Sequence, residues 1–233
     1  MTKIATKERL AKLQPLLALV LIVFALSIAR PDTFLTFDNG LNVLRQISIN
    51  LCLSIGMTMI IISGGIDLSV GSVLALSGAI AAGLLKDGID LPAWNISLQF
   101  TVFGAIVVGI AVGLTAGWLN GLVITRFRVP PFVTTLGMLS IARGLTMLWT
   151  GNHPITNLGA EFSFIGTGHF LSLPMPIWIS GALVAVFVVV TRRTRFGRYL
   201  YAVGGNERTA ALSGLNVNRI KLLVYTLGGG LAG

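Results

Sequence analysis

The stretch "ISGGIDLSVGSVLAL", residues 62–76, divides one long apolar run into two. Two adjacent glycines allow the chain to turn where a side chain would obstruct it. Asp67 or Ser69 can then cap the next helix, whose free amide groups need acceptors and favour a carboxylate. Irregular backbone at membrane depth must be buried in protein or face water, so we expect this turn to face the protein interior. The residues of this turn, which we expect to act as a helix cap or as an inner gate, are Gly64, Gly65, Asp67, Ser69 and Gly71.

The composition on both sides of this turn is that of a membrane protein. Of 233 residues, 54% are hydrophobic and 11% are charged, whereas a soluble domain carries about a quarter charged residues. The apolar residues form long blocks, so helical spans are the simplest interpretation. The single cysteine, Cys52, allows neither an internal disulfide nor a cysteine metal site, and we expect no bound metal.

Six apolar blocks and the start of a seventh have about the length that a transmembrane helix needs. They cover residues 13–29, 41–63, 68–85, 98–125, 132–149, 175–191 and 220–233. The sequence therefore predicts an all-α polytopic membrane protein with six transmembrane helices plus the start of a seventh. We expect one transmembrane permease domain over residues 1–233. The last residues, "YTLGGGLAG", lack a charged flank, and the expectation is a fragment of a longer, C-terminally truncated protein.

Charge sets the expected orientation, because cytoplasmic loops carry an excess of lysine and arginine. Lys3, Lys7, Arg9 and Lys12 place the amino end in the cytoplasm. Most other basic residues then also lie on the inner side, while most acidic ones lie outside. Orientation in a bacterial inner membrane thus explains the net charge of +9, and we expect contact with lipid and not with nucleic acid.

Glycines recur every fourth residue in "GIAVGLTAGWLNG", residues 109–121, and share one helix face. This spacing is typical of a groove into which a neighbouring helix packs closely. The alternative is a lining for a substrate path. The residues of this face are Gly109, Gly113, Gly117, Asn120 and Gly121, and the Asn120 side chain can hydrogen-bond across the groove.

Two charges lie within apolar blocks, Arg45 and Arg143. Arg45 is near the outer end of its block, so its side chain can reach the membrane surface, whereas Arg143 is near the middle. A charge at that depth costs about 2.5 kcal/mol or more, so its side chain should face protein or water. Asp67 and Glu161 are the available acidic partners. Two interpretations stay open: a structural arginine that ties helices together through carbonyl groups, or a residue that faces the solute.

The inner segment of residues 192–219 is expected to be a cytoplasmic loop with a short helix, "ERTAAL". Gly204 and Gly205 predict a turn, Asn206 an N-cap, and Gly214 a C-cap. The helix could rest on the membrane surface or dock into a groove of a soluble partner. The small side chains of Ala210 and Ala211 favour docking on a partner over insertion into lipid, which favours bulky apolar side chains. No nucleotide-binding, metalloprotease or serine-hydrolase motif occurs, so the chain is not expected to be an enzyme.

Three stretches in order resemble the permease subunits of bacterial ribose- and xylose-type ABC importers, most of all those of ribose importers. They are "GIDLSVGSVLALSGA" at 65–79, "GWLNGLVITRFRVPPFVTTLGMLSIARGLTMLWTGNHPI" at 117–155, and "TRFGRYLYAVGGNERTAALSGLNVNRIKLLVYTLGGGLAG" at 194–233. The resemblance runs from about Phe34 to the end of the chain.

This resemblance implies import of a monosaccharide, with a ribose-like pentose as the expected solute, by alternating access. Two permease subunits, identical or paralogous, form the pore, and full-length members have about ten spans. A cytoplasmic ABC ATPase binds ATP and magnesium, while this chain binds no cofactor. A periplasmic or lipid-anchored binding protein delivers the sugar. The loop helix then resembles the coupling helix that enters the ATPase, with Gly204, Gly205, Asn206, Glu207, Ala210, Ala211, Ser213 and Gly214.

Two alternatives remain at this point. A related ABC permease could carry a nucleoside, an autoinducer furanose or a branched-chain amino acid. A secondary transporter driven by an ion gradient would instead need acidic or histidine relays within the membrane, and only Asp67 qualifies.

Overall fold

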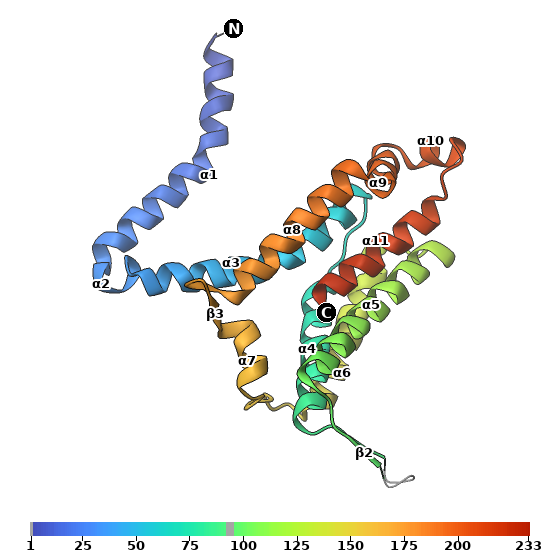
Figure 1. Ribbon diagram of the computed structural model, residues 1–233. Helices are drawn as coiled ribbons and strands as arrows, with labels where there is room; N and C mark the ends of the chain where they lie inside the picture. The colour runs from blue at the N-terminus through green and yellow to red at the C-terminus, as the bar shows by residue number, and fades with distance from the viewer. Residues whose placement is uncertain (1, 92–95) are drawn as a thin grey trace. The chain divides into compact units, whose positions relative to one another are not determined.

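The computed structural model describes the backbone of residues 2–91 and 96–233 and the side chains of residues 14–89 and 97–233, most of it helical (Figure 1). The side chains of Lys3, Lys7, Arg9 and Lys12 lie outside the described residues. The helices are α1 (Thr2–Ala29), α2 (Pro31–Phe34), α3 (Phe37–Ile62), α4 (Val70–Lys86), α5 (Val102–Arg126), α6 (Pro131–Thr150), α7 (Ala160–Thr167), α8 (Met175–Arg193), α9 (Arg195–Gly205), α10 (Glu207–Leu212) and α11 (Val217–Ala232).

The chain divides into two compact units, residues 1–46 and 47–233. The first unit holds α1, α2 and the start of α3. Pro31 opens α2, where its missing N–H costs nothing. The turn into α3 is held by the Asn39 side chain, whose amide donates to the Phe34 carbonyl at 2.9 Å.

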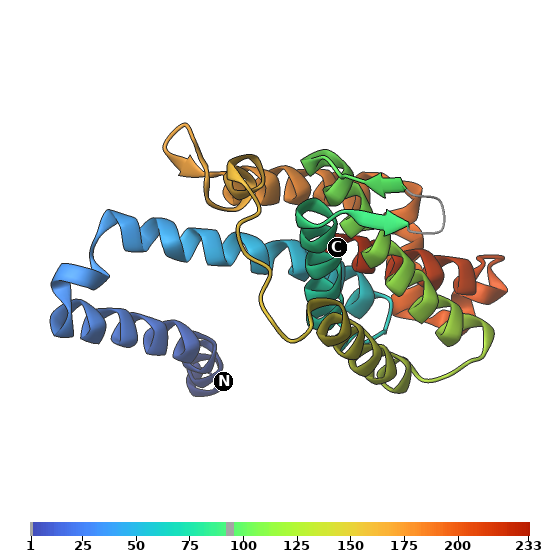
Figure 2. The ribbon, with the colours of Figure 1, turned by 90° about the horizontal axis from the view of Figure 1, so that it is seen from below.

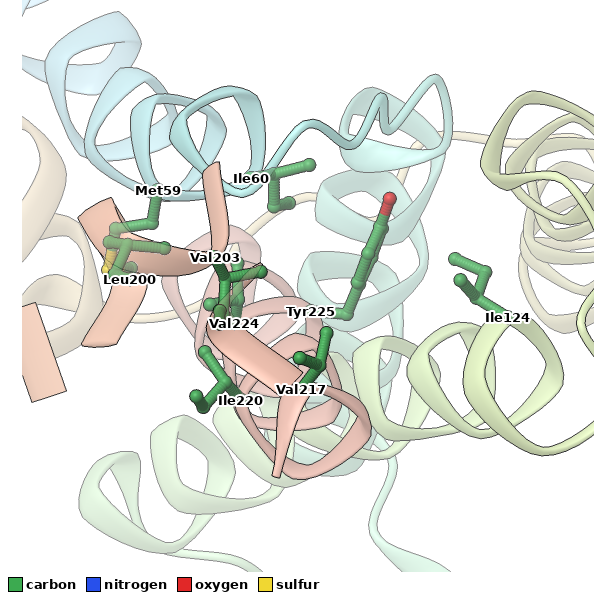
Figure 3. Packing of buried hydrophobic residues seen from close by; sticks show 10 residues of the cluster. Met59, Ile60, Ile124, Leu200, Val203, Val217, Ile220, Val224 and Tyr225 are labelled. Carbon is green, nitrogen blue, oxygen red and sulfur yellow. The ribbon is translucent and has the colours of Figure 1, made fainter. Parts of the chain in front are cut away.

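The second unit is built around α4, α5, α6 and α11, which lie side by side (Figures 1 and 2). Helix α11 runs along α5, and α4 packs against both α5 and α6. A buried apolar cluster joins α11 to the end of α3 and to the inner loop (Figure 3). Its buried members are Met59, Ile60, Ile124, Leu200, Val203, Ala210, Val217, Ile220, Val224 and Tyr225.

Each of the seven apolar blocks expected from the sequence lies mostly on a helix. Among the described residues, four helices are long and apolar enough to cross a membrane: α3, α5, α6 and α8. The apolar part of α1, Gln14–Ala29, and helix α4 are shorter. Many large apolar side chains on these helices stay exposed, as hydrocarbon surroundings permit. The chain is therefore a multi-pass membrane protein.

The chain is mostly helical, as expected, and two of its connections form short antiparallel hairpins that the sequence did not predict. Strand β1 (Ile89–Leu91) pairs with β2 (Ile96–Leu98), and β3 (His169–Phe170) pairs with β4 (Leu173–Pro174). Leu98 was expected to begin a span but lies in β2 opposite Ile89. Helix α5 begins only after Thr101, whose hydroxyl accepts from the Gly104 amide at 3.2 Å. Hydrogen bonding between the strands thus shortens the expected helix.

Candidate functional site

The turn after α3 is closed by two backbone hydrogen bonds of a Schellman motif. The Gly64 amide donates to the Ile61 carbonyl and the Gly65 amide to the Ile60 carbonyl, both at 2.9 Å. Gly64 has φ of 76°, a left-handed conformation that favours glycine. The two glycines therefore end α3 and turn the chain toward α4.

Gly65 also makes room for a side chain from the other end of the sequence. Tyr225 of α11 is 1% exposed, and its hydroxyl donates to the Ile66 carbonyl at 3.2 Å. Figure 3 shows the Tyr225 ring reaching from α11 toward the segment after α3. A side chain at position 65 would collide with that hydroxyl. Tyr225 was not predicted to be a site residue, although a hydroxyl group within an apolar helix is a signal that could have identified it.

Asp67 and Ser69 form a hydrogen-bonded pair ahead of α4. The Asp67 carboxylate accepts from the Ser69 amide at 2.8 Å and from the Ser69 hydroxyl at 2.6 Å. Ser69 holds the N-cap position, yet its side chain caps no amide of α4. The expected Ser69 cap is therefore wrong: the Ser69 hydroxyl donates to Asp67, and its oxygen accepts from the Asn120 side-chain amide instead of from an amide of α4. Gly71, on the first turn of α4, has open space around it.

Asn120 of α5 extends this pair into a buried polar cluster. Its side-chain amide donates to the Ser69 hydroxyl at 3.0 Å, which links α5 to the start of α4. Asn120, Ser69 and Asp67 are all at most 4% exposed. Burial raises the pKa of the Asp67 carboxyl, and the two hydrogen bonds from Ser69 partly oppose this. The polar groups of the turn thus hold three segments together inside the protein.

A pair of substitutions at Asp67 tests whether the carboxylate has a role beyond this cluster. Asp67→Asn keeps an oxygen acceptor for Ser69, so we expect a folded protein with largely unchanged uptake. Asp67→Leu leaves buried donors without an acceptor and should cost about 1–3 kcal/mol of stability. Thermal unfolding in detergent and solute uptake give the two readings. Complete loss of uptake in a normally folded Asp67→Asn protein would show that the charge acts in a gate.

The glycine face of α5 lies directly against α11. The α carbon and carbonyl of Gly229 face Gly113 and Gly117, and a side chain at Gly117 would meet the Tyr225 carbonyl. Gly121 faces the Leu222 backbone in the same way. The structure thus places these glycines in a helix–helix contact, where backbones approach too closely for side chains.

The inner loop departs from the sequence expectation at Gly204 and Gly205. They form the last turn of α9 and not a separate turn. A side chain at position 204 would strike the Ile62 carbonyl at the end of α3, while position 205 is open. Only Gly204 is therefore required by packing within the chain.

Helix α10 has the ends that the sequence predicts, with one shift. The Asn206 side chain accepts from the Thr209 amide at 2.9 Å, as expected of an N-cap. Ser213 is the C-cap, and Gly214 follows in a left-handed conformation with φ of 84°. Its neighbour Leu215 donates to the Ala210 carbonyl at 3.1 Å, which completes a Schellman motif.

The two faces of α10 have different roles. Ala210 is buried in the apolar cluster of this chain, so the expectation that it faces a partner is wrong. Ala211 is exposed, and the neighbouring Leu212 is 83% exposed. An ion pair of 2.6 Å between Glu207 and Lys221 fastens the helix to α11. Sequence reasoning missed Leu212, which presents the most exposed large apolar side chain of the described residues at the tip of this loop.

An open hollow lies beside α10, with a volume of about 610 Å³. Its lining residues are Glu207, Arg208, Ala211, Leu215, Asn216, Val217 and Asn218. An exposed apolar tip next to a hollow lined by both apolar and polar side chains has the character of a docking surface.

Arg143 lies on an exposed face of α6. The acids expected to pair with it do not: Asp67 bonds Ser69, and Glu161 lies in α7. Among the described side chains, Lys221 and Glu207 form an ion pair, and Arg143 forms none. In the same part of the chain, no three histidine, cysteine or acidic side chains come together as metal ligands.

The class that this fold and these sites define is a multi-pass membrane protein with a buried turn, a close-packed helix pair and an exposed loop helix. A family described as "Branched-chain amino acid transport system / permease component" matches residues 39–233, and the chain belongs to this family. Its members are transport components and not enzymes.

The chain is similar to several curated permeases. It is 40% identical over 220 residues to the ribose import permease protein RbsC of Haemophilus influenzae, which covers 93% of this chain and 64% of the relative. It is 41% identical over 220 residues to RbsC of Bacillus subtilis, covering 94% and 65%. It is 32% identical over 221 residues to the galactofuranose transporter permease protein YtfT of Escherichia coli, covering 92% and 62%. The chain thus spans somewhat less than two thirds of the length of these relatives. No solved structure matches.

Proposed function

We propose that this chain is the permease subunit of an ATP-driven importer that moves a monosaccharide of the ribose-like pentose class across the bacterial inner membrane. The observation that carries this proposal is the sequence identity of about 40% to ribose import permeases over nearly the whole chain. The mechanism is alternating access: a partner ATPase moves the inner loops, and the helices then open to one side of the membrane at a time.

The proposed topology has six spans and the start of a seventh, with the amino end in the cytoplasm. It is supported by seven apolar blocks that each lie mostly on a helix and by the basic residues between them. Helix α4 has 17 residues, about 26 Å, so it reaches across most of a hydrocarbon core of about 30 Å. The expectation that the natural protein continues to about ten spans stays a prediction.

The proposed partners are a cytoplasmic ABC ATPase, a periplasmic or lipid-anchored sugar-binding protein and a second permease subunit. ATP and magnesium bind to the ATPase, and this chain holds no cofactor. Helix α10 is the proposed coupling helix, since it exposes Ala211 and Leu212 while Ala210 and the pair Glu207–Lys221 anchor it. A rigidly held helix can transmit a push from the partner to α11.

The observations favour a sugar over the alternative solutes. The family description names branched-chain amino acids, but the similar curated proteins named here are permeases for ribose and galactofuranose. An ion-coupled secondary transporter is the second alternative. It is disfavoured because Asp67, the one acid near membrane depth, is buried and hydrogen-bonded to Ser69.

Uptake of radiolabelled ribose and related pentoses tests the function. The complete protein is placed in proteoliposomes together with the ATPase and the binding protein that are encoded by neighbouring genes. We expect uptake that needs ATP inside and stops with an ATPase variant unable to hydrolyse it. A collapsed ion gradient is the matched control and should leave uptake unchanged. Uptake that continues without the ATPase, or that follows the ion gradient, would refute the proposal.

A further inference from the structure

Helix α6 exposes one charged side chain among mostly apolar neighbours. Its buried residues are Thr135 and Ala142, which face the neighbouring helix α4. Arg143 is exposed, and no described residue pairs with it. The guanidinium carries five N–H donors that lose hydrogen bonds when they leave water. A face of this kind is unsuited to lipid.

Arg143 lies so deep in α6 that its guanidinium group does not easily reach the membrane surface. Helix α6 has 20 residues, and Arg143 lies seven positions before Thr150. At 1.5 Å per residue this is about 10 Å from the outer end in the proposed orientation. Side chains of a helix lean toward its amino end. The Arg143 side chain therefore leans away from the nearer surface and toward the membrane interior.

No acidic residue of this sequence is available to neutralise Arg143 at that depth. The eight acids are Glu8, Asp32, Asp38, Asp67, Asp87, Asp90, Glu161 and Glu207. None falls within a central turn of α3, α5, α6, α8 or α11. A second copy of these 233 residues could not supply a carboxylate either. Within residues 1–233, the partners available to Arg143 at that depth are therefore water and neutral oxygen atoms.

We propose that the face of α6 formed by Ser140, Arg143 and Met147 lines the water-filled translocation path. There the Arg143 guanidinium donates hydrogen bonds to hydroxyl oxygens of the passing solute. Ser140 and Met147 are exposed and lie one turn from Arg143 on the same face. The water-lined face is inferred from the exposure of Arg143 and its position within α6, whereas the contact with a sugar also rests on the proposed function.

The opposite side of α6 supplies matched controls. Ile141 is 57% exposed and Leu148 is 81% exposed, and both point away from the Arg143 face by helical geometry. These side chains are apolar and suit lipid. The proposal therefore predicts two faces of one helix with opposite contact with water.

Cysteine accessibility tests the proposal in the complete protein in membrane vesicles. Within this sequence a background without reactive cysteines requires only Cys52→Ser. In that background, Ser140→Cys, Arg143→Cys and Met147→Cys are treated with a charged, membrane-impermeant thiol reagent. We expect modification at least about 10-fold faster than for Ile141→Cys and Leu148→Cys. Ser140→Cys and Met147→Cys retain Arg143, so they keep the test valid if Arg143→Cys fails to insert. Equal, slow modification at both faces would overturn the proposal.

The contact with solute has a separate readout. Arg143→Leu and Arg143→Lys are compared for uptake at increasing sugar concentration, with membrane insertion measured in parallel. We expect at least a 10-fold fall in uptake for leucine and partial retention for lysine, which keeps donors and charge. Unchanged uptake by Arg143→Leu would refute the contact. If the cysteines on the Arg143 face react fast but uptake is driven by an ion gradient, the proposed function is refuted. The proposal that this face is lined by water would still hold.

Discussion

Gly117→Leu is expected to leave little folded protein. Gly117 of α5 lies against the Tyr225 carbonyl and within 3.0 Å of the Gly229 α carbon, measured from where its side chain would begin. These neighbours are backbone atoms, which cannot rotate away as a side chain can, so α5 and α11 would have to separate. Overpacking of a rigid site costs about 1–3 kcal/mol and sometimes more, and we expect the upper end here. Yield of monodisperse protein after detergent extraction and its melting temperature are the measurements.

Gly137→Leu is the matched control for this substitution. Gly137 lies in helix α6, is exposed, and has no atom within 4 Å of a side chain placed there. Leucine favours the helix over glycine by up to about 1 kcal/mol, so this variant should be as stable as the parent. Equal melting temperatures for Gly117→Leu and Gly137→Leu would show that α5 and α11 do not pack as described.

Leu212→Asp is expected to abolish ATP-dependent uptake in a protein that still folds. Leu212 is 83% exposed on α10, so the substitution breaks no packing within the chain. At a docking surface, however, it would place a charge in an apolar contact, which costs well over the 1.4 kcal/mol that lowers affinity tenfold. Co-purification of the ATPase and ATP-dependent uptake should both fall at least tenfold.

Two comparisons sharpen this test. Leu171→Asp changes a leucine that is 72% exposed in the loop between β3 and β4, and ATPase co-purification should stay normal. Gly205→Trp and Ala211→Trp add bulk at exposed positions of the same inner loop and should lose uptake as Leu212→Asp does. Gly204 is avoided, because its collision with Ile62 would disturb folding. Normal coupling in all three loop variants would remove α10 from the ATPase contact.

Residues with local roles were predictable from the sequence. Asn206 precedes a short helix and has no stronger competitor for its side chain, so its cap forms as expected. Ser69 occupies the same kind of position, yet its oxygen accepts from the side-chain amide of Asn120, 51 positions away, instead of from an amide of α4. Gly204 was assigned to a turn because glycine pairs favour turns, but its conformation is helical and its requirement comes from Ile62, far away in the sequence.

The sequence by itself determined the membrane class, the positions of the helices and the resemblance to importer permeases. These depend on the length of apolar runs, on short-range caps and on the order of motifs, which are all properties of neighbouring residues. The tertiary structure decided that Tyr225 closes over the turn at Gly65, that Asn120 reaches Ser69, and that Arg143 has no described partner. Such contacts join segments separated by up to 159 positions. They arise only when helices pack, because packing brings distant backbones within hydrogen-bonding distance.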